Sequence, residues 1–172
     1  MTWVVMVLAV TASAVAQSLL PGWPLLGGAR PPLLLGAVLY YGLQRAAGVM
    51  TAAAVFAGFL QDALGGVPLG WSTAFFCAAA WAVASFRLYL NGEAAVTHGV
   101  LGAAGAGALS LLTYGVLLRG GQVEWTPLAA LHHAAGSAAW GLAAVPAMVA
   151  FLRALDGAVG NVDVKEGVRG FR

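Results

Sequence analysis

The stretch Phe56-Ala-Gly-Phe-Leu-Gln-Asp-Ala-Leu-Gly-Gly-Val-Pro-Leu-Gly70 decides the fold, because it ends one apolar segment of the chain and leads into the next. Gly65 and Gly66 favour the end of a helix, since glycine readily adopts the left-handed conformation of a C-cap. Pro68 prevents the helix from continuing, because its ring fixes φ and removes a backbone donor. Gly70 then permits a tight approach before the next apolar segment. The stretch therefore predicts two helices joined by a locally specified turn.

One face of the first of these helices combines small side chains with a single acid. Residues at four-residue spacing share a helical face, and here they are Ala54, Gly58, Asp62 and Gly66. Small side chains let two membrane helices approach each other closely. This face is therefore predicted to pack against another helix and to direct Asp62 inward.

Asp62 is the only acid that falls inside a predicted span. A carboxylate at the centre of a bilayer costs roughly 2.5 to 3.5 kcal/mol on insertion scales, so such an acid marks a candidate functional site. The partial negative charge at the C-terminal end of a helix disfavours it further. We therefore predict a compensating donor, either Arg30 or Arg119 as counter-ion or a group of a partner protein. The alternative is that Asp62 reaches interfacial water from near the helix end.

The composition indicates a protein that lies in a membrane. Of the 172 residues, 61% are hydrophobic and 8% are charged, against about 25% charged in an ordinary soluble domain. Glycine occurs 24 times, which suits close packing of membrane helices. The net charge of +2 comes from isolated basic residues, so nucleic-acid binding is not indicated. Cys77 is the only cysteine, which excludes a disulfide framework and a Cys-based metal site.

Apolar segments recur along the chain up to about residue 152 and predict an all-α, polytopic membrane protein. A helix needs about twenty residues to cross a hydrocarbon core of about 30 Å. Segment 31–43 is shorter than this, which is compatible with a tilted, half-buried or re-entrant helix. We predict a membrane domain over 1–152 and a short cytoplasmic tail over 153–172, with six short transmembrane helices at about 2–20, 31–43, 49–66, 71–90, 98–118 and 128–152.

The positions of the basic residues predict the orientation of these helices, because cytoplasmic loops are enriched in Lys and Arg. With six crossings and a cytoplasmic N-terminus, only Arg30 and Arg119 lie outside. A five-crossing arrangement, which omits 31–43, distributes the arginines less consistently. We therefore predict six crossings with both termini in the cytoplasm, which places on that side Arg45, Arg87, Arg153, Lys165, Arg169 and Arg172.

Few residues could carry chemistry. His133 and Ser137 lie one turn apart, but a nucleophile and a base on adjacent turns of one helix are poorly placed for attack. His98 together with His132 or His133 could ligate haem, although single histidines at helix ends more often form interfacial hydrogen bonds. The sequence lacks the metalloprotease and phosphate-loop motifs. We therefore predict a protein that is not an enzyme and that uses no cofactor or metal.

Together these features resemble the rod shape-determining protein MreD family. The resemblance rests on the size, on six short helices with a brief polar tail, and on the stretch Pro31-Pro-Leu-Leu-Leu-Gly-Ala-Val-Leu-Tyr-Tyr-Gly-Leu-Gln-Arg45. It covers the first half of the chain, whereas the second half matches in hydropathy alone. The positions that match the family's signature are Gly58, Gln61, Asp62, Pro68, Leu69 and Gly70.

The resemblance implies a non-enzymatic subunit of the bacterial cell-elongation machinery in the cytoplasmic (inner) membrane. Such a protein would scaffold the bitopic protein MreC and, through it, a peptidoglycan glycosyltransferase–transpeptidase pair and the actin-like MreB filament. The fold would be similar to that of the substrate-binding subunits of energy-coupling-factor transporters. The alternative is a substrate-binding membrane subunit of a vitamin or small-molecule importer, whose pocket would need converging polar groups. For such a pocket the predicted spans offer mainly Gln61, Asp62, Ser110, His133 and Ser137.

Overall fold

The computed structural model describes residues 2–87, 94–121 and 126–160, and within them the chain is helical. The all-α prediction is confirmed. Four of the helices are long and apolar enough to cross a membrane, namely α1, α3, α5 and α6, whereas α2 and α4 are apolar but shorter. The elements are α1 (Thr2–Leu19), the short 3-10 helix η1 (Pro24–Leu26), α2 (Leu33–Gln44), α3 (Ala47–Gly65), α4 (Trp71–Phe86), α5 (Ala95–Arg119) and α6 (Pro127–Ala158).

The last helix is longer than predicted. The last helix was predicted to end at about residue 152, but α6 continues to Ala158, so the predicted end of this helix is wrong. The helix continues because its buried stripe does: Leu152 is followed one turn later by Asp156, which is 4% exposed. In the sequence, Asp156 suggested a solvated chain, whereas in the structure Arg45 compensates its charge. Residues 161–172 of the predicted tail, and 88–90 of the predicted fourth helix, lie outside the described residues.

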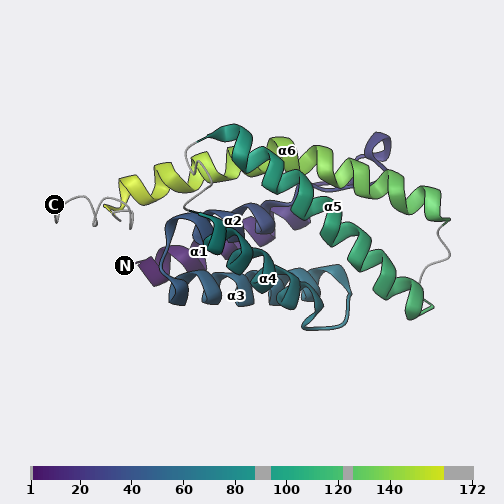
Figure 1. The fold of residues 1–172 in the computed structure, drawn as a ribbon, viewed down its shortest axis with the longest axis horizontal. Coiled ribbons are helices and arrows are strands. Elements are labelled where there is room, and N and C mark those ends of the chain that lie inside the picture. The colour runs from purple at the N-terminus through teal and green to yellow at the C-terminus, as the bar shows by residue number, and fades with distance from the viewer. Residues whose placement is uncertain (1, 88–93, 122–125, 161–172) are drawn as a thin grey trace.

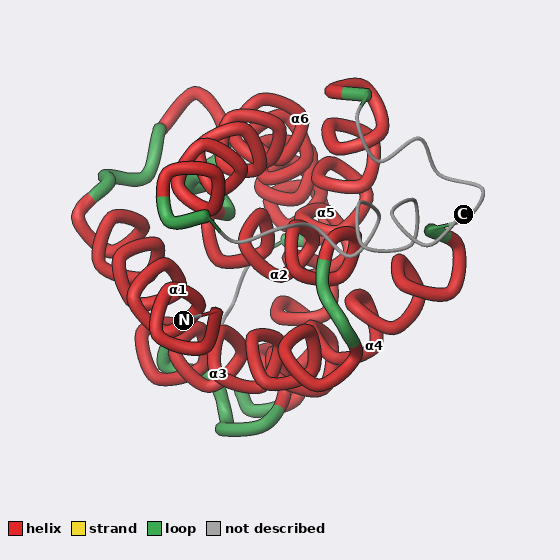
Figure 2. The backbone as a smooth tube through the Cα atoms, turned by 90° about the vertical axis from the view of Figure 1, so that its left-hand side faces the viewer, coloured by secondary structure: helices red, strands yellow, loops and turns green. Residues whose placement is uncertain are grey.

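α2 lies at the centre of the bundle, with the other α-helices arranged around it (Figure 2). It begins directly after Pro31-Pro32, and every residue from Leu34 to Gln44 is buried. A helix that is apolar on all sides is expected in such a position, because it has no face for water. Its 12 residues extend over only about 18 Å at 1.5 Å per residue. The short helix is thus enclosed by protein.

α5 and α6 form a pair that lies across the layer of the other helices (Figure 1). The two helices cross where Gly102 faces Gly141, and a Cβ atom on either glycine would collide with the backbone carbonyl of the other. Gly99 and Gly107, one to two turns away on α5, also face α6. The stripe of small residues on α5 therefore serves packing within this chain.

α1 begins and α6 ends at the same end of the bundle. Figure 1 shows that the start of α1 and the end of α6 lie together, opposite the turn between α3 and α4. An even number of passes along the bundle produces this arrangement. The outer surface carries many exposed large apolar side chains, such as Val4, Leu8, Phe59 and Leu131.

α3 and α4 form the predicted hairpin. Gly66 (φ 64°) ends α3, and Gly70 (φ 101°) precedes α4, so both use a left-handed conformation that favours glycine. Between the two helices, a Cβ atom on Gly58 would collide with the backbone of Thr73. The absence of a side chain at Gly58 therefore sets how closely α3 and α4 approach.

Replacing Gly58 by Ala tests this packing. Because the backbone of Thr73 cannot move aside without shifting α4, we expect a loss of about 1 to 3 kcal/mol in the free energy of unfolding. Gly48→Ala is the matched control, since Gly48 is in the same helix and nothing lies within 4 Å of a Cβ there. The control is expected to be neutral or stabilising by up to about 1 kcal/mol. Unfolding of the purified protein in detergent measures both, and equal stability of the two variants would contradict the prediction.

Candidate functional site

Asp62 connects the two helices of the α3–α4 hairpin. Its carboxylate is 1% exposed and accepts hydrogen bonds from the backbone N–H groups of Gly70 (2.8 Å) and Ser72 (2.9 Å). The Thr73 hydroxyl lies 3.4 Å from the same carboxylate. Gly70 is the N-cap of α4, where the first N–H groups have no partner within the helix. Asp62 thus caps a helix that begins nine residues after it.

The prediction that Arg30 or Arg119 neutralises Asp62 is corrected by this geometry. Within the part of the chain that the structure describes, neither arginine forms an ion pair with the carboxylate. The compensation comes from backbone donors and from the positive end of α4, which outweigh the unfavourable negative end of α3. Burial within the hairpin also rules out the alternative that Asp62 reaches interfacial water.

The other positions that match the family's signature lie around this cap. Gln61 accepts a hydrogen bond from the side-chain amide of Gln17 on α1 (2.8 Å), and the Gln17 carbonyl accepts from the backbone N–H of Leu34 (3.1 Å). This chain of amides joins α3, α1 and the start of α2. Pro68 lies in the turn, and Leu69 is exposed at 67%. The motif residues therefore hold the hairpin and its neighbours in place.

A cavity of about 400 Å³ lies at the same end of the bundle as the turn between α3 and α4. Four of the five polar residues that the sequence offered for a pocket line it, namely Gln61, Ser110, His133 and Ser137, whereas Asp62 does not. Arg30, which follows η1, also lines the cavity, although the sequence suggested it only as a counter-ion of Asp62. Its guanidinium could not be assigned to the cavity from sequence, because η1 and the loop after it are placed by contacts with α6.

Most of these polar groups already have partners within the protein. The His133 ring is 2.7 Å from the Gly27 carbonyl through Nδ1, and the Ser137 hydroxyl donates to the backbone carbonyl of His133 (2.9 Å). Ser137 therefore does not form a dyad with the His133 ring. The His133 ring thus fastens the end of η1 to α6, whereas the Ser137 hydroxyl bonds within α6, and the two side chains do not form a nucleophilic centre.

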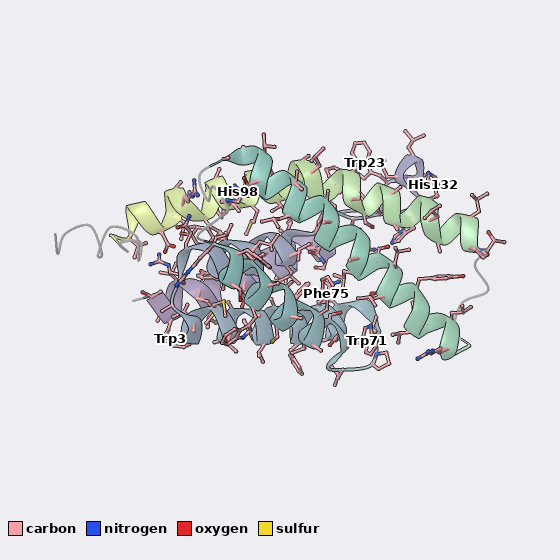
Figure 3. The ribbon with its side chains drawn as sticks, in the orientation of Figure 1. Trp3, Trp23, Trp71, Phe75, His98 and His132 are labelled. Carbon is pink, nitrogen blue, oxygen red and sulfur yellow. The ribbon has the colours of Figure 1, made fainter. Side chains whose placement is uncertain are left out.

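The histidines considered as haem ligands are not brought together. Figure 3 shows His98 near the start of α5 and His132 toward the opposite end of the bundle, near the start of α6. His98 is buried, whereas His132 is exposed. Across the described residues, no group of three His, Cys, Asp or Glu side chains is arranged to hold a metal ion.

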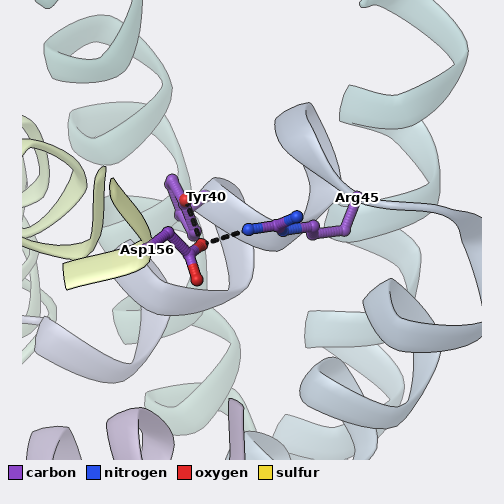
Figure 4. A network of polar contacts seen from close by, with 3 residues as sticks. All are labelled: Tyr40, Arg45 and Asp156. Carbon is purple, nitrogen blue, oxygen red and sulfur yellow. Dashed lines mark hydrogen bonds and ion pairs between the residues drawn. The ribbon is translucent and has the colours of Figure 1, made fainter. Parts of the chain in front are cut away.

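A second polar cluster lies at the other end of α2 and was missed from the sequence. Asp156 of α6 forms an ion pair with Arg45, which follows α2, and accepts a hydrogen bond from the Tyr40 hydroxyl (Figure 4). Asp156 is 4% exposed and Arg45 is 5% exposed. The available signal was the spacing of Met148, Leu152 and Asp156, which continues one face of α6.

Comparison of the chain with protein-family models, with curated proteins and with solved structures finds no match. The resemblance to the MreD family therefore remains a prediction that rests on the residues quoted for it.

Asp62→Ala and Asp62→Asn together test the cap. Alanine leaves the N–H groups of Gly70 and Ser72 without an acceptor, so we expect a loss of about 1 to 3 kcal/mol in the free energy of unfolding. Asparagine keeps one acceptor oxygen and should lose about half as much. Ser18→Ala, which removes an exposed hydroxyl, is the control and should change stability by less than about 0.5 kcal/mol. Unchanged stability of Asp62→Ala in detergent would refute the capping role.

A double-mutant cycle tests the Arg45–Asp156 pair. Removing one partner leaves a buried charge, so Arg45→Met and Asp156→Leu should each cost about 3 to 5 kcal/mol. The double variant contains neither charge and should be more stable than the sum of the two losses predicts, by at least about 1 kcal/mol. Unfolding in detergent provides the four free energies. Additive losses would show that the two side chains are not coupled.

Proposed function

We propose that this chain is a multi-pass, non-enzymatic subunit of the bacterial cell-elongation complex, as its resemblance to the MreD family implies. The α3–α4 hairpin carries the proposal. The positions that match the family's signature, Gly58 to Gly70, lie in this one element, where Gly58 sets the helix spacing and Asp62 caps α4. A hairpin held this firmly can present a fixed surface to another protein, because little conformational freedom is lost on binding.

The tip of the hairpin supplies the surface for such a partner. Leu64, Leu69 and Trp71 are exposed there and surround the turn that the motif builds. Partner binding is thus proposed for these exposed neighbours, while Gly58, Gln61, Asp62, Gly66, Pro68 and Gly70 shape the support beneath them. Aromatic and aliphatic anchors of this kind often contribute most of the energy of an interface.

The proposed orientation is six crossings of the inner membrane with both termini in the cytoplasm. Two observations support it. The start of α1 and the end of α6 lie at one end of the bundle, together with Arg45 and its partner Asp156. The short α2 is enclosed by other helices, so it need not match the full thickness of the lipid. The similarity in fold to substrate-binding subunits of energy-coupling-factor transporters belongs to the same proposal.

The proposed partners are an MreC-like bitopic protein and, through it, the glycosyltransferase–transpeptidase pair, with MreB reached indirectly. A bitopic protein has a single membrane helix and a large outer region. In the proposed orientation the hairpin tip lies at the outer face of the membrane, where such a partner leaves the bilayer. The tip therefore stands at the level at which both parts of the partner can be contacted.

Depletion of the protein in its host tests the proposal. Rod-shaped cells are expected to become round, and wild-type protein should restore rods. A Leu69→Ala/Trp71→Ala variant should accumulate normally but fail to restore shape, with about tenfold less MreC-like protein co-purified, which corresponds to about 1.4 kcal/mol. Trp3→Ala is the control, because Trp3 is exposed at the opposite end of the bundle (Figure 3). Cells that stay rod-shaped on depletion would refute the proposal.

A second candidate function is a substrate-binding subunit of a small-molecule importer. The cavity of about 400 Å³ favours it, since ligand pockets span about 300 to 1,000 Å³. The internal hydrogen bonds of Gln61, His133 and Ser137 count against a polar nutrient, which would need these groups for itself. Mass spectrometry of the purified protein separates the two functions. A soluble nutrient retained through purification, with normal shape after depletion, would favour the importer.

A further inference from the structure

We propose that the cavity binds the anionic group of an amphiphile, a phosphate or a carboxylate, with the apolar part of that molecule against the inner wall. The proposal does not depend on the scaffold function. The cavity lies between the C-terminal halves of α1, α3 and α5 and the N-terminal half of α6. α3 and α5 face each other across it without packing together. The space is therefore a gap in the bundle that other side chains leave unfilled.

The charge of the lining is positive. Among the described residues that line the cavity, Arg30 carries the one permanent charge, and no carboxylate lines it. Arg30 is exposed and forms no ion pair within the described residues. Asp62 of the hairpin does not face the cavity, because its carboxylate accepts from the N–H groups of Gly70 and Ser72 at the start of α4. An anion at this mouth would therefore meet a guanidinium, and no carboxylate among the described lining residues would compete with it.

Arg30 is carried on a segment that α6 holds in place. Gly27 at the end of η1 has φ 63° and packs so closely on the backbone of His133 that a Cβ atom would collide with it. Gly136 on α6 in turn faces the backbone carbonyl of Leu26 so closely that there is no room for a side chain. Trp23 and Trp140 stack edge to face at 5.5 Å beside them. The guanidinium is thus attached to a fixed support at the mouth.

α5 adds hydroxyl groups to the same space. Ser110 and Thr113 are three residues apart, hence on one face of the helix, and both line the cavity. Within the described part of the chain these two hydroxyls form no hydrogen bond of their own. Hydroxyl donors together with an arginine are well suited to the oxygen atoms of a phosphate or carboxylate.

The inner wall is apolar. Leu35 of the central helix, Phe76 of α4, and Leu109 and Leu117 of α5 form much of it. A fully hydrated ion gains nothing from such a wall, whereas an alkyl or isoprenoid portion is stabilised there because its apolar surface is removed from water. The combination of a cationic mouth and an apolar interior therefore selects an anionic amphiphile. Such a molecule can come from the membrane, as a lipid, or from solution.

Native mass spectrometry of the detergent-purified full chain tests the proposal with phosphatidylglycerol as anionic probe and phosphatidylcholine as zwitterionic reference. The wild-type protein is expected to bind phosphatidylglycerol at least about tenfold more tightly than phosphatidylcholine, or about 1.4 kcal/mol. Arg30→Gln should abolish this preference and Arg30→Lys should retain part of it. Arg119→Gln, at the exposed end of α5 and outside the cavity lining, should leave it unchanged. An Arg30→Gln variant that keeps the preference would overturn the proposal.

A second pair of variants separates the cavity from a merely charged surface. Ser110→Phe fills the cavity from α5 without changing charge and should weaken binding of phosphatidylglycerol at least about tenfold. Leu111→Phe, at an exposed neighbour that does not line the cavity, should have no effect. Equal binding by both would overturn the proposal. Competition by millimolar inorganic phosphate would support recognition of a free anion, and its failure to compete would support a lipid as the source.

Discussion

The Asp156 carboxylate determines where α2 can lie, because it holds the C-terminal end of this helix against α6. An ion pair buried at 4 to 5% exposure is costly to form unless the geometry is good and further donors are present. Tyr40 supplies such a donor on one side and Arg45 supplies the opposite charge on the other. At the opposite end of α2, the Gln17 side chain accepts from the backbone N–H of Leu34. The central helix is thus held by polar contacts at both ends and by apolar contacts between them.

Packing around α2 depends on backbones that come close together. Apolar side chains gain little by leaving lipid for protein, so close contact and hydrogen bonding must provide the attraction between membrane helices. Gly58 against Thr73 and Gly102 against Gly141 provide the close contact. The Asp62 carboxylate accepts hydrogen bonds from the backbone N–H groups of Gly70 and Ser72, which would otherwise be unpaired in an apolar region. The acid that is unexpected in an apolar span thus pairs with the N–H groups at which α4 begins.

The sequence was sufficient for the helices and for the α3–α4 turn, because apolar runs, glycines and Pro68 act locally. It was not sufficient for the partners of the acids. The donors of Asp62 are eight and ten residues further along, and a helix start after Gly70 could have indicated them. The partner of Asp156 is 111 residues earlier, and no local pattern connects the two. Arg45 was read as a loop charge and Asp156 as part of a tail, since each looks solvated when its counterpart is unknown.

The cavity follows from the same small residues that hold α5 and α6 together. These helices are closest where Gly102 meets Gly141, and the residues that line the cavity, such as Ser110 and His133, lie about two turns beyond that crossing. Two straight helices that cross at a close point must separate on both sides of it, and the gap widens with distance along them. On one side of the crossing α2 packs against α6, with Gly36 beside the Met148 side chain. On the other side η1, fastened through Gly27 and Gly136, covers α6 but does not reach α3. The cavity is therefore a consequence of the crossing geometry, and filling it requires a molecule or a larger side chain.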